Sequence, residues 1–191
     1  MLRLNSEKTY EVIYFILNNR RFSQLEVSKK LGVSFGRVNK IVQWLEKQKF
    51  VSRVKRRYVL DTPVALIQLL SKYVELDFVS FEIDFPRKEL VKELKKEGVV
   101  FCLTSALEEF DSYFREIEIN IYKPNENILE KLKNSKKGLT KVNVFTSNIS
   151  LKENIIKKNG KTVTTEIRTL IDLFSSNKAY AGEILIKKVF K

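Results

Sequence analysis

The sequence predicts an α+β protein with two domains: a helical domain with a basic β-hairpin over residues 1–60, and an α+β domain with a mixed sheet over residues 61–191. Three observations lead to this prediction. Apolar residues recur with the helical period before residue 47, helix-period and strand-period segments alternate after residue 61, and positive charge is concentrated before residue 60. Asp61-Thr62-Pro63 begins a new segment, because Thr62 can cap a helix and proline is favoured at its first position.

The charge is distributed unevenly along the chain. The formal net charge is +13, and residues 1–60 carry 14 Lys and Arg against 4 Asp and Glu. Residues 61–191 carry 22 Lys and Arg against 19 Asp and Glu. Because proteins neutralise phosphates with clustered Lys and Arg, this asymmetry predicts that the first domain binds nucleic acid.

Three helices are expected in the first domain. The first covers about residues 6–18, and residues 18–22 form a loop. Ser23 and Glu26 form a capping box for a short second helix, which Gly32 ends. Ser34 is a suitable N-cap for the third helix, residues 34–47. The third helix has one apolar face, made by Val38, Ile41, Val42 and Leu45.

The basic run Lys55-Arg56-Arg57 lies between two apolar segments, which predicts a tight basic hairpin. Two helices joined by a glycine-containing turn form a helix-turn-helix pattern. With the hairpin, residues 6–60 resemble the winged helix-turn-helix of prokaryotic transcription regulators. The resemblance implies that the third helix enters the major groove of double-stranded DNA. The residues expected to contact DNA are Ser34, Arg37, Asn39, Lys40, Gln43, Lys47, Lys55, Arg56 and Arg57.

Side-chain chemistry suggests a role for each of these residues. Arg37 suits a guanine edge, and Asn39 or Gln43 suits an adenine or a phosphate. Lys40 and Lys47 are expected to contact phosphates, and the hairpin cations are expected to bind the backbone or the minor groove.

The second domain is expected to begin with an apolar helix near residues 64–73, buried either within one chain or across a homodimer. Asn159-Gly160 is a strong hairpin turn. The expected strands cover residues 77–84, 99–103, 116–122, 142–145 and the region around 162–163. The expected helices cover residues 87–97, 106–113, 127–134, 165–174 and 180–190.

One part of this domain resembles nucleotidyltransferases. The strand-turn-helix around Thr104-Ser105 precedes a strand with Glu116 and Glu118, and period-2 alternation would put both carboxylates on one face, where they could hold metal ions. The family usually has glycine where Thr104 stands and Asp where this chain has Glu, so we expect a similar scaffold without the activity. An equally weighted interpretation makes Ser105 a helix cap and makes Glu116, Glu118 and Asn120 the solvated face of a half-buried strand.

A second resemblance spans nearly the whole chain. The winged helix, the run Leu103-Thr104-Ser105-Ala106-Leu107, a strand at 117–122 and the run Arg168-Thr169-Leu170-Ile171-Asp172-Leu173 are similar to AbiEi-type antitoxins of type IV toxin–antitoxin systems. The resemblance implies a DNA-binding autorepressor whose C-terminal domain counters a cognate nucleotidyltransferase toxin and has no catalytic residues of its own. Arg168 and Asp172 are spaced for an ordinary i,i+4 helix pair, and we interpret them that way.

Composition excludes several kinds of site and several classes of protein. Cys102 is the only cysteine and histidine is absent, which excludes an intramolecular disulfide, a His-based triad and a His-based zinc site, so no metal or cofactor is expected. No apolar run is long enough for a membrane span, and Met1-Leu2-Arg3-Leu4-Asn5 lacks the apolar core of a signal peptide. A cytoplasmic regulator is therefore expected. The alternatives are a divergent nucleotidyltransferase-like enzyme and a winged-helix module that binds protein.

Overall fold

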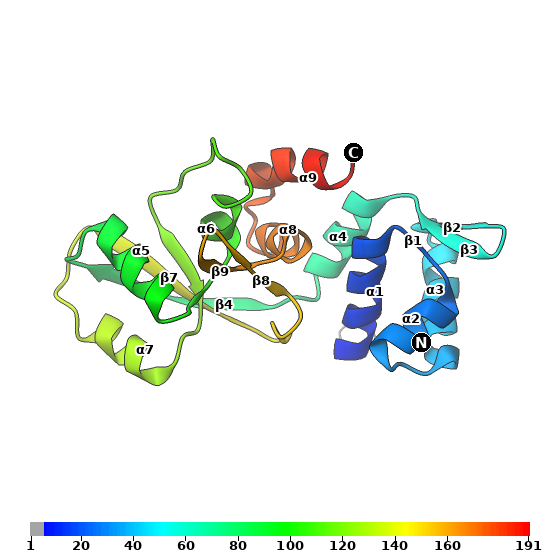
Figure 1. The fold of residues 1–191 in the computed structure, drawn as a ribbon, viewed down its shortest axis with the longest axis horizontal. Helices are drawn as coiled ribbons and strands as arrows, with labels where there is room; N and C mark the ends of the chain where they lie inside the picture. Colours follow the sequence, from blue (N-terminus) through cyan, green and yellow to red (C-terminus); the bar gives the residue numbers. More distant parts are fainter. Residues whose placement is uncertain (1–5) are drawn as a thin grey trace. The chain divides into compact units, whose positions relative to one another are not determined.

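The computed structural model describes residues 6–191 and divides into two compact units, the first ending at Val74 and the second covering Glu75–Lys191 (Figure 1). Residues 1–5, on which the expectation about a signal peptide rests, lie outside the described residues. The division falls after Val74, whereas the sequence suggested residues 60 and 61. Each unit has its own sheet and its own buried core.

The first unit contains the three helices expected from the sequence, α1 (Glu7–Asn19), α2 (Gln24–Leu31) and α3 (Phe35–Lys47). The Ser23 hydroxyl accepts a hydrogen bond from the Glu26 N–H at 3.2 Å, which is one of the two hydrogen bonds of the predicted capping box. Gly32 ends α2 in the left-handed conformation with φ +60°, which confirms its expected role. Ser34 stands at the N-cap of α3, but its side chain makes no capping hydrogen bond, so that part of the prediction is wrong.

A three-stranded antiparallel sheet in the order β1-β3-β2 accompanies these helices. β2 (Val51–Val54) and β3 (Arg57–Leu60) pair as a hairpin with Lys55 and Arg56 at its turn, as the basic run predicted. β1 (Arg21–Phe22) pairs with β3 where the sequence suggested only a loop. Two residues are too few to show a strand period, so this strand depends on its partner rather than on its own pattern.

Helix α4 (Pro63–Ser71) belongs to the first unit. It begins at Pro63 as expected, but Thr62 makes no side-chain cap and instead donates its hydroxyl to the Lys49 carbonyl oxygen at 3.5 Å. Leu66, Ile67 and Leu70 are buried, and α4 contacts α1. The helix therefore extends the core of the first unit, which explains why the division falls later than expected.

The second unit is built on a six-stranded mixed sheet in the order β4-β7-β6-β5-β9-β8. β6 is parallel to β7 and β5 is parallel to β9, while the other neighbours are antiparallel. The strands are β4 (Leu76–Ile83), β5 (Val100–Phe101), β6 (Ile119–Tyr122), β7 (Thr140–Ser147), β8 (Ile155–Lys158) and β9 (Lys161–Thr164). The Asn159-Gly160 turn joins β8 to β9, as predicted.

Helices cover both faces of this sheet (Figure 1). α6 and α8 bond to Asn120 and Tyr122 on one face, through Thr104 and Asp172 respectively. Ile83 points to the opposite face, where it meets α5 and α7. The helices are α5 (Arg87–Lys96), α6 (Leu103–Leu107), α7 (Glu126–Lys133), α8 (Glu166–Ser175) and α9 (Glu183–Val189), with a 3₁₀ turn η1 (Ala179–Gly182) before α9.

Two elements differ from the expectation, and both carry residues that resemble those of nucleotidyltransferases. The strand expected at 116–122 covers only Ile119–Tyr122, so Glu116 and Glu118 precede it. The helix expected at 106–113 is Leu103–Leu107, and it starts abruptly because the buried Leu103 adopts a left-handed φ of +49°. Such a conformation costs a β-carbon-bearing residue about 1–2 kcal/mol, so the packing around Leu103 must hold it.

No helix among residues 6–191 combines the length and apolar content needed to cross a bilayer.

Candidate nucleic-acid interface

Helix α3 presents a solvent-facing strip without an acidic side chain. Gly36, Lys40, Gln43 and Lys47 are all exposed and lie within about 60° of one another around the helix axis. The opposite side is fully buried and consists of Val38, Ile41, Val42 and Leu45, as the period predicted. One face of α3 therefore fixes the helix in the core, and the other is available to a partner.

The polar side chains of this strip bind no other residue of the described chain. Lys40, Gln43 and Lys47 have no hydrogen-bond or ion-pair partner among residues 6–191. Gly36 adds to the strip because a β-carbon placed there would meet no atom within 4 Å, so the helix surface is open at this point. A phosphate backbone can approach α3 most closely beside a residue that has no side chain.

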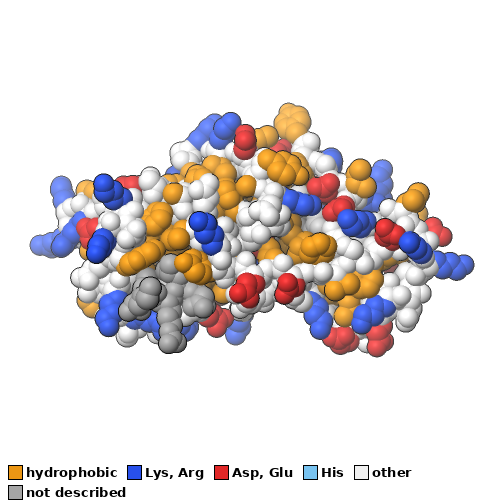
Figure 2. Space-filling view, turned by 180° about the vertical axis from the view of Figure 1, so that it is seen from behind, with side chains coloured by type: hydrophobic (Ala, Val, Ile, Leu, Met, Phe, Trp, Pro, Cys, Tyr) orange, Lys and Arg blue, Asp and Glu red, His pale blue; other side chains and the backbone are white. Residues whose placement is uncertain are grey.

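The β2–β3 hairpin adds a second group of cations. Residues 53–57 are all exposed, and Arg53, Lys55, Arg56 and Arg57 have no partner among the residues that the structure describes. Figure 2 shows Lys and Arg side chains at the hairpin end of this unit, on the left in that view. Arg53 was not among the residues expected to bind DNA, although its position directly before the basic run was a usable signal.

Two predicted DNA-contacting residues already make hydrogen bonds within the unit. The Arg37 guanidinium donates to the Ser6 hydroxyl at 2.9 Å, which directs the side chain toward the start of α1. The Gln24 amide donates to Asn39 Oδ1 at 3.0 Å and to the Tyr58 hydroxyl at 3.3 Å. Gln24 thus joins α2, α3 and β3, and it leaves the Asn39 NH₂ group as the donor that can face a ligand.

The structure brings six of the nine predicted residues together in two separate groups of three. Lys40, Gln43 and Lys47 share the exposed strip of α3, and Lys55, Arg56 and Arg57 share the hairpin. The remaining three lie at the margins. Arg37 and Asn39 flank the strip, and Ser34 is exposed at the start of the helix.

One charged pair of the second unit is buried instead of exposed. Arg168 and Asp172 on α8 are both fully buried, with Nε and Oδ1 2.7 Å apart. The Arg168 guanidinium also donates to the hydroxyls of Tyr122 (2.7 Å) and Ser147 (2.9 Å), and Tyr122 donates to Asp172 at 2.8 Å. The expected i,i+4 pair of Arg168 and Asp172 is confirmed, but it is buried and bonded to two further side chains instead of lying on the surface, because helical spacing alone does not show which side of α8 faces the sheet.

Burial changes the proton affinities around this cluster, which we call the Arg168 network (Arg168, Asp172, Tyr122 and Ser147). Burial raises the pKa of Asp172, while the Arg168 guanidinium and the Tyr122 hydroxyl oppose that change. Burial and the Asp172 charge raise the pKa of Tyr122 and of the nearby Cys102 thiol. Cys102 is fully buried, and a raised pKa disfavours the thiolate, which is the nucleophilic form.

The residues suggested by nucleotidyltransferases form a polar chain beneath α6. The Ser105 hydroxyl accepts from the Asn120 N–H at 2.9 Å rather than capping a helix. Asn143 donates to Asn120 at 3.0 Å and to Glu118 at 2.8 Å. A hydrogen bond from Lys141 holds the pKa of Glu118 below its usual value, and Lys178 adds to the effect at 3.6 Å. Glu118 is thus engaged by two lysines, and Asn120 is fully buried, so the solvated strand face expected to include Asn120 is wrong.

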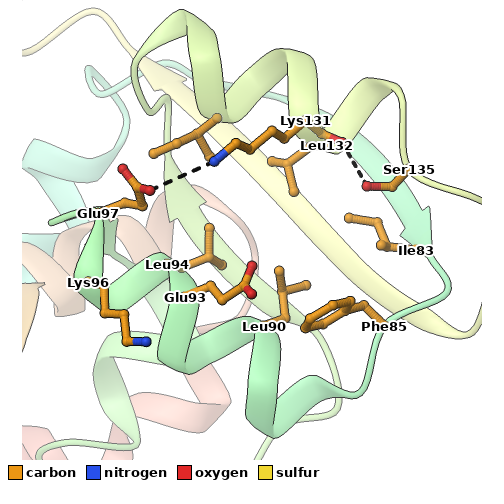
Figure 3. Close-up of a pocket in the computed structure, with 11 residues that line it drawn as sticks. Ile83, Phe85, Leu90, Glu93, Leu94, Lys96, Glu97, Lys131, Leu132 and Ser135 are labelled. Carbon is orange, nitrogen blue, oxygen red and sulfur yellow. Dashed lines mark hydrogen bonds and ion pairs between the residues drawn. The ribbon is translucent and has the colours of Figure 1, made fainter.

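A cavity of about 360 Å³ lies between α5 and α7. Figure 3 shows Leu90, Leu94 and Leu132 lining it, with the Lys131–Glu97 ion pair (3.9 Å) across one end. None of the predicted site residues lies in it, and the described residues hold no group of three or more His, Cys, Asp and Glu that could bind a metal. The exposed surface of α3 and the hairpin is therefore the candidate site.

Comparison of the chain with protein-family models, with curated proteins and with solved structures found no match.

Proposed function

We propose that this protein is a sequence-specific, double-stranded-DNA-binding transcriptional regulator whose first unit acts as a winged helix-turn-helix. The observation that carries the proposal is the acid-free strip of α3, which lies opposite the buried stripe and has unpartnered cations. In a helix-turn-helix, this is the face that lies in the major groove. The four cations of the hairpin would serve as the wing.

The chemistry of the α3 side chains suggests which part of the DNA each one would contact. Lys40 and Lys47 would neutralise phosphates, and Gln43 between them would reach base edges. Asn39 would donate through its NH₂ group, because Gln24 occupies its Oδ1. This arrangement favours an acceptor such as a phosphate or a guanine edge over the paired donor and acceptor of adenine.

Arg37 would read a guanine after leaving Ser6. Its hydrogen bond to the Ser6 hydroxyl is exposed, so exchanging it for a bidentate contact with a base costs little. The exchange would also couple DNA binding to the start of α1.

The wider assignment follows the resemblance to AbiEi-type antitoxins. We propose a cytoplasmic autorepressor that can form a homodimer. Its second unit binds a cognate toxin and performs no catalysis. The alternative, a divergent nucleotidyltransferase that uses Glu116 and Glu118, is less well supported, because Glu118 is bound by Lys141 and Lys178. Metal-dependent nucleotide incorporation that Glu118→Ala abolishes would reverse that judgement.

The test is a fluorescence anisotropy titration of the full chain against DNA from upstream of its own gene and against a scrambled duplex, each at two salt concentrations. We expect tighter binding to the upstream DNA at both concentrations, because base contacts are less sensitive to salt than phosphate contacts. A matched control replaces Lys88, Lys92 and Lys152, three exposed lysines of the second unit, with alanine. No binding at either salt concentration would contradict the proposal and favour a protein-binding module.

A further inference from the structure

The two edges of the six-stranded sheet are built differently. β8 has four residues, and two of them, Lys157 and Lys158, are lysines. β4 has eight residues and contains no Lys, Arg or Pro. Exposed edge strands are normally kept short or protected by lysine, proline or a bulge, since their free N–H and C=O groups otherwise recruit another strand. Within residues 6–191, β4 pairs with β7 on one side and with no strand on the other (Figure 1). Residues 136–138 bond to the far end of β4: the Asp84 N–H donates to the Lys136 carbonyl oxygen at 2.8 Å, and the Gly138 N–H donates to the Glu82 carbonyl oxygen at 3.3 Å. The open part of this edge is therefore residues 76–81.

β4 also exposes apolar side chains on both of its faces. Phe78 is 59% exposed and Val79 is 61% exposed, and consecutive residues of a strand point to opposite faces. The Phe78 ring lies 5.2 Å from that of Phe145 on β7, which holds it in place beside the open edge. An added strand would bring its own side chains to both faces and would cover these two residues together.

The charge around β4 is opposite to that of the chain. Four carboxylates and no cation occur in residues 75–84, whereas the whole chain has a net charge of +13. Glu82 pairs with Lys137 at 3.3 Å. Glu75, Asp77 and Asp84 have no ion-pair partner in the described part of the chain. Because Lys136 and Lys137 lie against the Glu82 end of β4, the acidic part of the open edge is its start, where Glu75 and Asp77 would attract a cationic segment.

We propose that the free edge of β4 is a docking site for an extended, basic segment of a partner protein, which adds to the sheet as a seventh strand. Main-chain hydrogen bonds would provide affinity, Phe78 and Val79 would provide apolar contacts, and the carboxylates would select Lys or Arg. A second copy of β4 is a poor occupant, because its carboxylates would face those of the first copy. The proposal concerns the second unit and does not depend on DNA binding by the first.

The probe is a labelled synthetic peptide of about ten residues in which Lys alternates with Val and Thr, the composition that an added strand requires. One matched peptide replaces every Lys with Glu. Another keeps the lysines and carries N-methyl groups on alternate residues of one edge. With the full chain, we expect binding of the basic peptide, about tenfold weaker binding of the N-methylated one, and no binding of the acidic one. Equal binding of the basic peptide and its N-methylated form would overturn strand addition.

Two point variants test whether the peptide binds at the edge of β4. Val79→Lys introduces a protective lysine at an exposed position of β4, and it should weaken the basic peptide about tenfold or more, because like charges repel. Ile156→Lys makes the same change on β8, where Ile156 is 36% exposed, and should leave binding unchanged. Equal loss in both variants, or none in Val79→Lys, would refute the site. A dimer that Val79→Lys dissociates would make a second copy the occupant and would also refute it.

Discussion

Two groups of charged side chains, one in each unit of this protein, stand in contrasting surroundings. In the first unit, the cations of α3 and the hairpin are exposed and have no partner in the described chain. In the second unit, Arg168 is fully buried and meets three oxygen-bearing side chains. An exposed cation without a partner keeps its capacity to bind an anion, whereas a buried cation with satisfied donors stabilises the fold.

The contrast identifies different measurements for the two sets of residues. Removing a cation of the Arg168 network should change the free energy of unfolding. Removing a cation of α3 or the hairpin should change binding and leave unfolding nearly untouched. The predictions below begin with the largest expected effect.

The largest effect is expected for Arg168→Met. The change leaves Asp172 buried without its cation, and breaking a buried pair in this way costs about 3–5 kcal/mol. Urea unfolding followed by circular dichroism measures the loss, and the fluorescence of Trp44, the only tryptophan, provides a reference signal from the first unit.

The matched control for this prediction is the double variant Arg168→Met with Asp172→Leu. Replacing both members of a buried pair with apolar residues is often close to neutral, so the double variant should recover much of the lost stability. If the double variant were as unstable as the single one, the hydrogen bonds to Tyr122 and Ser147 would matter more than the ion pair.

The next largest effect is expected when Lys55, Arg56 and Arg57 are all changed to alanine. Each lost phosphate contact lowers the slope of log K against log salt by about 0.9, so the slope should fall by up to about 3. Affinity should decrease similarly for the upstream and scrambled duplexes, because phosphate contacts carry no sequence information. An unchanged slope would show that the hairpin does not touch DNA.

Arg37→Ala should instead reduce the difference in affinity between the upstream and the scrambled DNA. We expect a loss of about 1–3 kcal/mol in binding to the upstream DNA and little change on the scrambled duplex. Ser6→Ala removes the hydroxyl that Arg37 contacts in the free protein but keeps the guanidinium, so it serves as the comparison. Equal weakening on both duplexes after Arg37→Ala would assign this residue to a phosphate.

The smallest effect is expected at the ion pair of Glu109 with Lys161. Partial burial raises the pKa of Glu109, but hydrogen bonds from Lys161 and Asn159 outweigh it and hold the pKa below the ordinary 4.5. A carboxyl with a lowered pKa stabilises the fold above that value, and the stabilisation disappears as the pH falls through the lowered pKa.

The size of this contribution is about 1 kcal/mol, as for other modest ion pairs. Urea unfolding between pH 7 and pH 3 should show it as a loss of stability on acidification that is smaller in Glu109→Gln than in the parent protein. Identical pH profiles for the two proteins would mean that Lys161 gains as much from water as from Glu109.

Local patterns predicted the first unit well. Ser23 caps α2, Gly32 ends it, and the stripe of Val38, Ile41, Val42 and Leu45 is buried. These features depend on residues within one or two turns of each other, so a single sequence contains the information. The DNA contacts stay predictions because they concern a ligand, and the winged-helix assignment stays a prediction because no family model or solved structure matches the chain.

Features that depend on distant partners were less predictable. The alternation at 116–122 suggested one strand, yet the strand begins only at Ile119, and Glu118 before it pairs with Lys141 and Lys178 from distant parts of the sequence. Thr104 and Ser105 looked like helix caps, but both bond to Asn120 on β6. Side chains that can bond locally or across the fold choose according to the packing around them.

The sequence alone determined the helices of the first unit, the hairpin, the asymmetric charge and the α+β class, because periodicity, capping and composition act over short distances. Only the tertiary structure decided that Arg168 and Asp172 are buried, that β4 is an edge strand with no strand beyond it over residues 76–81, and that the cations of α3 have no partner among the described residues. These properties depend on which surfaces meet when the chain folds, and burial decides whether a charge supports the fold or remains free to bind.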